Sequence, residues 1–249
     1  MQTIAVISDI HGNLPALEAV LADIDARDVF ATWHLGDLVG YGPWPNETVD
    51  LIRQRQIAGV AGNYDSTVAT DYKHCGCRYE DARQEALSHE SYRWTREHVT
   101  AETKHLLGRL PFRIDVRPGG GHLAGPQLIL VHGTPVLNTV YWTEDRPDDF
   151  CRQMAQKAGA RTGDVIAFGH THLPWQREVD GVRFVNTGSV GRPKDGDPRA
   201  GYALLTLEGD AVRVEWPRVE YDLPRVSAGI VAGGLPEAFA TFLSTGGRL

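Results

Sequence analysis

Seven side chains that can bind a divalent metal ion each follow a short apolar segment of this sequence. They occur in the blocks SDIHGN, HLGDLVGYGP, VAGNYD, LVHGTP and FGHTHLP, and they are Asp9, His11, Asp37, Asn63, His132, His170 and His172. Carboxylate, amide and imidazole donors suit Mn, Fe, Zn and similar divalent ions, whereas soft metals prefer thiolates. This set and its order predict a hydrolytic site built on two metal ions.

The apolar segments before these residues predict buried strands that would bring the seven side chains together. The segments are TIAVIS, FATWHLG, IAGVAG, QLILV and DVIAF. Short apolar runs bounded by Gly, Asp or Asn are typical of strands, and ligands of open α/β sheets bind beyond the carboxyl ends of strands. A purely structural role explains the set poorly, because no hydrophobic core needs seven such polar residues at strand ends.

The first sixty residues predict alternating strands and helices. Strands are expected at residues 3–8, 30–35 and 57–61. Helices are expected to begin at Asn13, which can cap the first turn, and at Asn46. The buried face of the first helix is expected at Leu14, Leu17, Leu21 and Ile24. A βαβαβ beginning indicates a layered α/β fold with a mainly parallel sheet.

The remaining chain predicts a helical insertion followed by further strands. Residues 66–110 are expected to form a helical cap over the site, with helices at 79–98 and 101–108, inside a single domain of residues 1–249. Its expected buried anchors are Leu87, Trp94, Leu106 and Leu107. After a helix at 145–158 and a strand at 164–168, alternating segments predict antiparallel strands of a second sheet at 182–187, 201–207 and 211–216. One short helix is expected near 236–243.

Composition and charge narrow the possible functions. The 249 residues are 42% hydrophobic and 23% charged, with a net charge of −7 and no run of Lys or Arg. Extended nucleic acid is an unsuitable partner, because its binding needs a basic face. No signal peptide and no membrane-spanning apolar stretch are visible. With three cysteines, Cys75, Cys77 and Cys151, the chain is expected in a reducing, cytoplasmic setting.

The blocks DIHGN, GDLVGYGP, GN, HG and GHTH, in this order, resemble those of the calcineurin-like metallophosphoesterase superfamily. The segments GDLVGYGPWPNE and NTGSVGRPKDGDPRAGYALL are similar to its small prokaryotic phosphodiesterase branch. The resemblance extends from Asp9 to about residue 207. It implies a four-layer αββα sandwich with two divalent metal ions per chain, Mn or Fe first, with Zn, Ni or Co as alternatives.

The resemblance also implies a role for each of the seven residues. Asp9, His11 and His172 would hold one ion, while Asn63, His132 and His170 would hold the other. Asp37 would bridge both ions, and a hydroxide between them would attack phosphorus in line. Asn63, as a neutral ligand, would keep the site cationic enough to attract phosphate.

The residue after Asn63 departs from the family pattern. Many members have a histidine there that can protonate the leaving oxygen, whereas this chain has Tyr64. A tyrosine, with an ordinary pKa near 10, is a poorer acid at neutral pH. His74 and Tyr41 are alternative candidates for this catalytic or substrate-binding role. Arg192 could bind phosphate through both guanidinium nitrogens, or be a solvated loop arginine.

Three functions are compatible with the sequence. The first is hydrolysis of small phosphodiester or nucleotide-like substrates. The second is a phosphomonoesterase or protein phosphatase, and the third is a non-catalytic scaffold that uses the site to bind protein. Seven intact ligands favour catalysis, because a scaffold is expected to lose them. The oligomeric state is left open, with a homodimer as one candidate.

Overall fold

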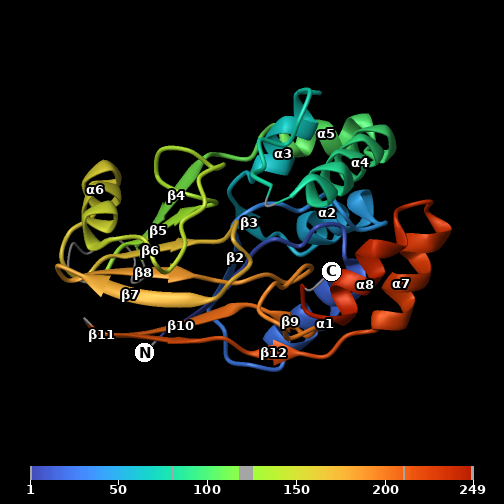
Figure 1. Cartoon of the computed structure of the whole chain (residues 1–249). Coiled ribbons are helices and arrows are strands. Elements are labelled where there is room, and N and C mark those ends of the chain that lie inside the picture. The colour runs from blue at the N-terminus through green and yellow to red at the C-terminus, as the bar shows by residue number, and fades with distance from the viewer. Residues whose placement is uncertain (1, 80, 118–125, 210, 248–249) are drawn as a thin grey trace.

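The computed structural model describes residues 2–79, 81–117, 126–209 and 211–247. Two five-stranded sheets lie face to face, with helices on their outer sides (Figure 1). The first sheet contains β1 (Gln2–Ile7), β2 (Ala31–His34), β3 (Ala58–Gly59), β10 (Ala203–Glu208) and β11 (Ala211–Glu215). The second contains β4 (Arg113–Val116), β5 (Leu128–Val131), β6 (Val165–Phe168), β7 (Trp175–Val179) and β8 (Val182–Asn186). The predicted α/β sandwich is confirmed.

The strand order is β11-β10-β1-β2-β3 in the first sheet and β4-β5-β6-β8-β7 in the second. Within the first sheet β1 runs parallel to β2, and β2 runs parallel to β3. Strands β9 (Ala200–Gly201) and β12 (Arg218–Val219) form a separate short pair. The parallel strands end at the same edge, so the loops that follow them meet there.

The helices are grouped at different places around the sheets (Figure 1). Their bounds are α1 (Leu14–Asp25), α2 (Pro45–Gln54), α3 (Asn63–Ala69), α4 (Ala82–His98), α5 (Ala101–Leu107), α6 (Asp148–Ala158), α7 (Leu223–Ala232) and α8 (Glu237–Ser244). Helices α3, α4 and α5 gather at one end, and α6 lies at the opposite end. No helix in the described ranges is both long and apolar enough to span a bilayer.

Both faces of β1 are buried, and alternate residues serve different layers. Ile4 and Val6 join the core between the sheets, which also contains Leu130 from β5. Ala5 and Ile7 face the other way and pack in a core with helix α1. Complete burial of one aliphatic side chain of this size contributes about 1.5–3 kcal/mol. The period of two along the strand therefore explains why helices cover the outside of the sandwich.

Helix α1 confirms the expected cap, whereas α2 begins one residue before the expected position. The Asn13 side chain accepts a hydrogen bond from the Ala16 backbone at 3.2 Å. Helix α2 begins at Pro45, and Asn46 lies inside it. The Asn46 amide instead donates to the His98 carbonyl at 2.9 Å and accepts from the Thr100 N–H at 2.9 Å. Asn46 therefore does not cap α2 but connects the end of α4 to the start of α5.

The last strands are antiparallel where β10 pairs with β11, as predicted, but their predicted place together in a second sheet was wrong. Strands β10 and β11 extend the first sheet, where β10 runs antiparallel to β1, with Thr3 opposite Thr206. Strand β8 alone belongs to the second sheet, and it runs parallel to β6. Alternating hydrophobicity indicates which side chains face a core, but it does not identify the neighbouring strand.

Two further elements were missed although the sequence carries signals for them. Strand β7 pairs with β8 through a turn at Asp180 and Gly181, both with positive φ, and Asp-Gly is a strong hairpin signal. Helix α7 begins after Asp222, whose side chain accepts from the Arg225 N–H at 2.9 Å. The sequence Asp-Leu-Pro there has the same cap pattern as the Asn-Leu-Pro that precedes α1. The tail thus contains two helices rather than one.

Candidate metal centre

The strand-to-loop junctions bring the predicted side chains to one edge of the sandwich. Asp9 follows β1, Asp37 follows β2, and His132 follows β5. Six of the seven form two compact donor clusters, each with ligand atoms within 4.8 Å of one another, and all six are buried. The first cluster is Asp9, His11 and His172, and the second is Asp37, His132 and His170.

Short distances within each cluster bring nitrogen and oxygen donors together. In the first, His172 Nε2 lies 3.2 Å from Asp9 Oδ1 and 3.2 Å from His11 Nε2. In the second, His132 Nε2 lies 3.2 Å from His170 Nδ1 and 3.5 Å from Asp37 Oδ2. These are buried groups with little water to satisfy them, so a cation between them is the natural partner.

Asp37 and Asn63 complete the arrangement. Asp37 Oδ2 lies 3.8 Å from His11 Nε2 of the first cluster, in addition to its contact with His132 of the second. One carboxylate oxygen therefore lies between the clusters. Asn63 Oδ1 lies 3.0 Å from His132 Nε2, which adds an amide oxygen to the second cluster.

The histidine rings are oriented by backbone carbonyls behind them. His11 Nδ1 lies 3.1 Å from the Val39 carbonyl, and His132 Nδ1 lies 2.7 Å from the Leu35 carbonyl. His172 Nδ1 contacts the Arg192 carbonyl at 2.5 Å. We assign the proton of each ring to Nδ1, because a carbonyl accepts only from N–H. The Nε2 lone pairs then face the clusters, as in metal-binding histidines.

Among the buried side-chain atoms without a hydrogen-bond partner in the described ranges, two belong to the donor clusters. They are Asp9 Oδ1 and His170 Nε2. The two facing Nε2 atoms of His11 and His172 present lone pairs to each other under the same proton assignment. Both features are unfavourable without a positive charge, and both fit a bound divalent metal ion.

The backbone at this edge is held in an uncommon conformation. Five of the cluster residues have φ between 51° and 65°: Asp9, His11, Asp37, His170 and His172. Left-handed backbone costs a residue other than glycine on the order of 1–3 kcal/mol and is concentrated at functional sites. Cross-loop hydrogen bonds hold it here, including Asp9 N to Gly36 O at 3.0 Å and His11 N to Asp37 O at 2.9 Å.

Comparison with known proteins identifies the family. Residues 2–210 match the calcineurin-like phosphoesterase superfamily domain. The chain belongs to this superfamily. It is therefore a metal-dependent phosphoric ester hydrolase, and its two donor clusters are candidate metal sites.

Several relatives cover nearly the whole phosphoesterase. An uncharacterised protein of Methanocaldococcus jannaschii is 34% identical over 255 residues, covering 94% of each chain. Phosphodiesterase YfcE of Escherichia coli is 27% identical over 217 residues, covering 82% of this chain and 88% of that protein. The crystal structure of a metallophosphoesterase from Sphaerobacter thermophilus has a TM-score of 0.75 and 32% identity, covering 98% of this chain and 99% of that one.

The charge distribution of the phosphoesterase site favours a cation inside it. Burial alone would raise the pKa of Asp9, but His172, with His132 and His11, lowers it below the ordinary value. Burial alone would lower the pKa of His132, yet the Asp37 and Asp9 carboxylates raise it to about 9. A proton on His132 thus has the position and charge that a metal ion would supply.

Asp65 connects the loops of two site residues. Its carboxylate accepts from the Leu38 N–H at 2.9 Å and from the Gly62 N–H at 3.0 Å. Burial, and then the Asp37 carboxylate, raise the pKa of Asp65 to about 7. Asp65 therefore holds the Asp37 loop against the start of α3.

The three candidate acid residues, Tyr64, His74 and Tyr41, have different surroundings in the structure. The buried Tyr64 donates its hydroxyl to Ser91 Oγ at 3.5 Å, while its backbone N–H binds Asp37 Oδ1 at 2.9 Å. Burial, followed by the nearby Tyr41, raises the pKa of Tyr64 well above its ordinary value. His74 accepts from the Gly76 N–H at 3.2 Å and packs its ring 5.0 Å from Tyr72. Tyr41 packs its ring 5.1 Å from His11.

We predict that Tyr64→Phe keeps most of the activity of the phosphoesterase. The Tyr64 hydroxyl faces Ser91, so its removal costs about 0.5–1.5 kcal/mol of stability and leaves the chemistry intact. A general acid contributes about 10²–10⁴-fold to rate, so a loss of that size would assign the role to Tyr64. The measurement is turnover of aryl and alkyl phosphodiesters by both proteins at fixed Mn²⁺.

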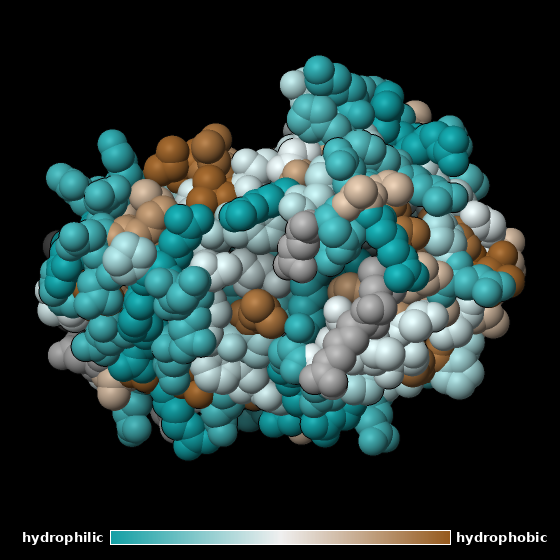
Figure 2. Space-filling model, viewed as in Figure 1, coloured by the Kyte–Doolittle hydropathy of each residue, from teal (hydrophilic) through white to brown (hydrophobic). Residues whose placement is uncertain are grey.

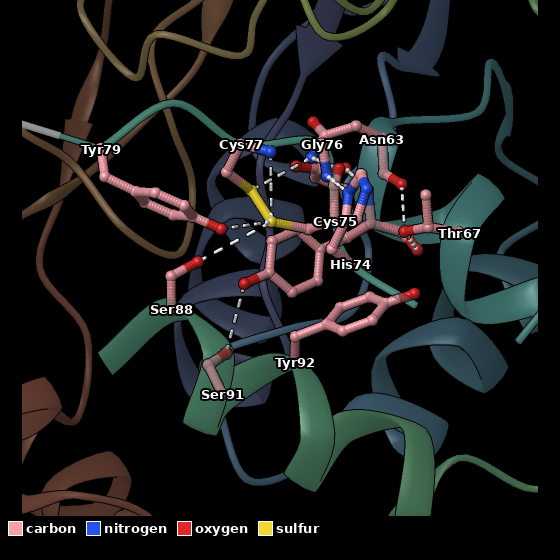
Figure 3. The surroundings of a disulfide bond; sticks show 12 residues. Asn63, Thr67, His74, Cys75, Gly76, Cys77, Tyr79, Ser88, Ser91 and Tyr92 are labelled. Atoms are coloured by element: carbon pink, nitrogen blue, oxygen red, sulfur yellow. Dashed lines mark hydrogen bonds between the residues drawn. A yellow bond between two sulfur atoms is a disulfide. The ribbon is translucent and has the colours of Figure 1, made fainter. Parts of the chain in front are cut away.

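A disulfide joins Cys75 and Cys77 beside the centre (Figure 3). The turn at Gly76, which has a positive φ, brings the two cysteines together. Cys151 is a free, buried cysteine. The Asn63 side-chain amide donates to the Cys75 carbonyl at 3.0 Å and to Cys77 Sγ at 3.6 Å. This loop thereby directs Asn63 Oδ1 toward His132.

We predict that replacing both Cys75 and Cys77 with serine weakens metal binding by about tenfold. Partners of metal-binding side chains typically contribute 10–100-fold, and the retained Cys75 carbonyl places the effect at the lower end. Titration of metal-free protein with Mn²⁺ measures the change. Cys151→Ser is the control, because it leaves the disulfide intact; equal affinities for all three proteins would show that the loop does not orient Asn63.

Proposed function

We propose that this phosphoesterase hydrolyses small phosphodiester or nucleotide-like substrates at a centre of two divalent metal ions. The observation that carries the proposal is the position of Asp37 Oδ2, within 3.8 Å of His11 Nε2 and 3.5 Å of His132 Nε2. A carboxylate between two histidine clusters is the arrangement that places two cations side by side. The resemblance to phosphodiesterase YfcE supports a diester as the substrate.

Each residue of the centre has a distinct part in this proposal. Asp9, His11 and His172 would hold one ion, Asn63, His132 and His170 would hold the other, and Asp37 would lie between them. Two bound ions would supply Lewis acidity to the phosphoryl oxygens and lower the pKa of a water molecule. The donor set suits Mn or Fe, and also Zn, Ni or Co.

The chain's own groups then determine what reaches phosphorus. The backbone carbonyls behind His11, His132 and His172 keep their Nε2 atoms directed inward. Burial of the donors excludes competing water, which strengthens every charge interaction in the site. Segment 66–110 contributes to the lining of a cavity beside the centre, which supports its role as a cap that restricts access to small substrates; the residues are Cys77, Arg78, Tyr79, Gln84, Leu87 and Ser88.

Hydrolysis of two chromogenic esters tests the proposal. Metal-stripped protein is reloaded with Mn²⁺ and assayed with bis-p-nitrophenyl phosphate and p-nitrophenyl phosphate. We expect activity that depends on metal and is higher with the diester. A higher rate with the monoester would favour a phosphomonoesterase, and activity with neither in protein that holds two ions would favour a scaffold. Metal analysis of protein purified without added metal identifies the native ions.

A further inference from the structure

A cavity of about 270 Å³ lies beside the two donor clusters. Six separate parts of the chain line it, represented by Tyr41, Arg78, Tyr141, Leu173, Arg192 and Phe242. The face of the molecule in Figure 2 is hollowed near its centre, between the sheet-rich half and the helical half. A cavity of this volume suits part of a small substrate rather than a polymer.

Three contacts connect this cavity to the metal centre. The Tyr41 ring lies 5.1 Å from the His11 ring, and the Tyr141 ring lies 4.1 Å from the His170 ring. The Arg192 carbonyl contacts His172 Nδ1. A phosphoryl group on the metal ions would therefore extend its substituent directly into the cavity.

Arg192 is the unusual residue of the cavity. Its side chain is buried, with 9% of the residue exposed. The guanidinium lies between two rings, 4.0 Å from the centre of Tyr41 and 3.7 Å from the centre of Phe242. Within the described ranges no carboxylate pairs with it, and burial lowers its pKa, opposed by the nearby Tyr41, Tyr64 and Tyr141.

A buried guanidinium without an anion has unused binding capacity. Arginine has five N–H donors in a planar fork, and ring faces satisfy its charge only in part. The two rings also hold the fork in one plane, which suits bidentate binding of phosphate. The described lining of the cavity also includes Arg78 and contains no Asp or Glu, which favours an anionic ligand.

The walls of the cavity are suited to a flat organic group. Two aromatic and two aliphatic side chains line the cavity beside the arginines: Tyr79, Tyr141, Leu87 and Leu173. Leu173 is apolar and yet 38% exposed. Aromatic and aliphatic walls with a few cations are typical of sites that bind a ring bearing a charged group.

We propose that Arg192 is a specificity-determining residue that binds a second phosphoryl group, outside the metal centre. The preferred substrate then carries at least two phosphoryl groups and a planar ring, as in a nucleoside diphosphate ester. This inference rests on the proposed function, because the first phosphoryl group is taken to lie on the metal ions. It adds the substrate class that the same centre selects.

Binding of adenosine 5′-diphosphate and adenosine 5′-monophosphate to the Mn²⁺-loaded protein tests the proposal. Both are measured by calorimetry and by competition with bis-p-nitrophenyl phosphate, which has one phosphoryl group. We expect the parent to prefer the diphosphate, and Arg192→Met to reduce that preference by about tenfold or more. The preference of Arg192→Lys for the diphosphate should lie between those of the parent and Arg192→Met, because lysine keeps the positive charge but lacks the planar fork of N–H donors.

Arg225→Met is the matched control. Arg225 also stacks on a ring, at 5.4 Å from Trp44, but it is 44% exposed and pairs with Glu18. Its replacement removes the same charge and should leave the preference for the diphosphate unchanged. Circular dichroism and thermal unfolding of each variant separate loss of binding from loss of fold.

The possible outcomes are distinguishable. Equal losses of monophosphate and diphosphate binding in Arg192→Met would place Arg192 on the reacting phosphoryl group and overturn the proposal. Unchanged binding of both in a folded Arg192→Met or Arg192→Lys variant would make Arg192 a packing residue. If the parent hydrolyses the diester and Arg192→Met does not change the preference for the diphosphate, the proposed function stands and this inference fails. If binding of the diphosphate depends on Arg192 but the Mn²⁺-loaded parent hydrolyses no ester, only the proposed function is overturned.

Discussion

Replacing Asp37 with asparagine is expected to abolish nearly all activity and to reduce the metal content to one ion or none. Asp37 Oδ2 lies between the clusters, at 3.8 Å from His11 Nε2 and 3.5 Å from His132 Nε2. Asparagine keeps an oxygen that can accept from the Tyr64 N–H, so the hydrogen bond between residue 37 and the start of α3 is retained. Only the negative charge that would lie between the two proposed cations is lost. Removal of one partner of a buried charge pair costs about 3–5 kcal/mol, which corresponds to roughly 10²–10⁴-fold in rate.

Asp65→Asn is the control that separates charge from loop packing. Asp65 is equally buried and near Asp37, but its oxygens accept from the backbone of Leu38 and Gly62. We expect this variant to lose thermal stability and retain two ions. Metal content by mass spectrometry and turnover of a chromogenic diester measure both proteins. Two ions with near-parent turnover in Asp37→Asn would show that Asp37 does not bridge.

Adding one methyl group at Gly62 is expected to have the next largest effect. A Cβ at this position would lie 2.0 Å from Asp37 Oδ1 and 2.3 Å from the Asp37 nitrogen. The backbone conformation itself, with φ of −77° and ψ of 177°, suits any residue, so the cost is purely steric. Gly62→Ala must displace Asp37 or the start of α3, and overpacking of this kind costs about 1–3 kcal/mol.

A displaced Asp37 should also reduce turnover by about 10²-fold, the effect expected of a misplacement near 1 Å. The matched control is Gly108→Ala, at the exposed end of α5 with φ of −67° and its nearest non-adjacent atom at 3.3 Å. Thermal unfolding, metal content and turnover should all remain close to the parent in that control. The same result for Gly62→Ala would mean that the carboxylate has more room than the structure indicates.

The candidate metal residues could be predicted because each depends on local sequence. A polar ligand that follows an apolar run is visible without knowledge of the partner strands, as for Asp9 after β1 and His132 after β5. Parallel strands then bring such junctions to one edge as a consequence of topology. The structure accordingly assembles six of these residues into two clusters.

Other features could not be predicted, because they depend on contacts between distant segments. The place of β10 beside β1 joins residues about two hundred positions apart, and no local pattern records that pairing. The environment of Tyr64 has the same origin, since Ser91 of α4 determines where its hydroxyl points. The hairpin at Asp180 and the cap at Asp222 are different cases: their signals were local and readable.

The sequence alone determined the α/β class, the family resemblance and the residues available to bind metal, because these follow from periodicity and from short blocks of fixed order. Only the tertiary structure decided how those residues face one another and what surrounds them. Arg192 shows the difference most clearly: its type was visible, but Phe242 of α8 and Tyr41 enclose it from opposite ends of the chain. Burial and charge pairing are sums over all neighbours in space, so they are defined only once the chain has folded.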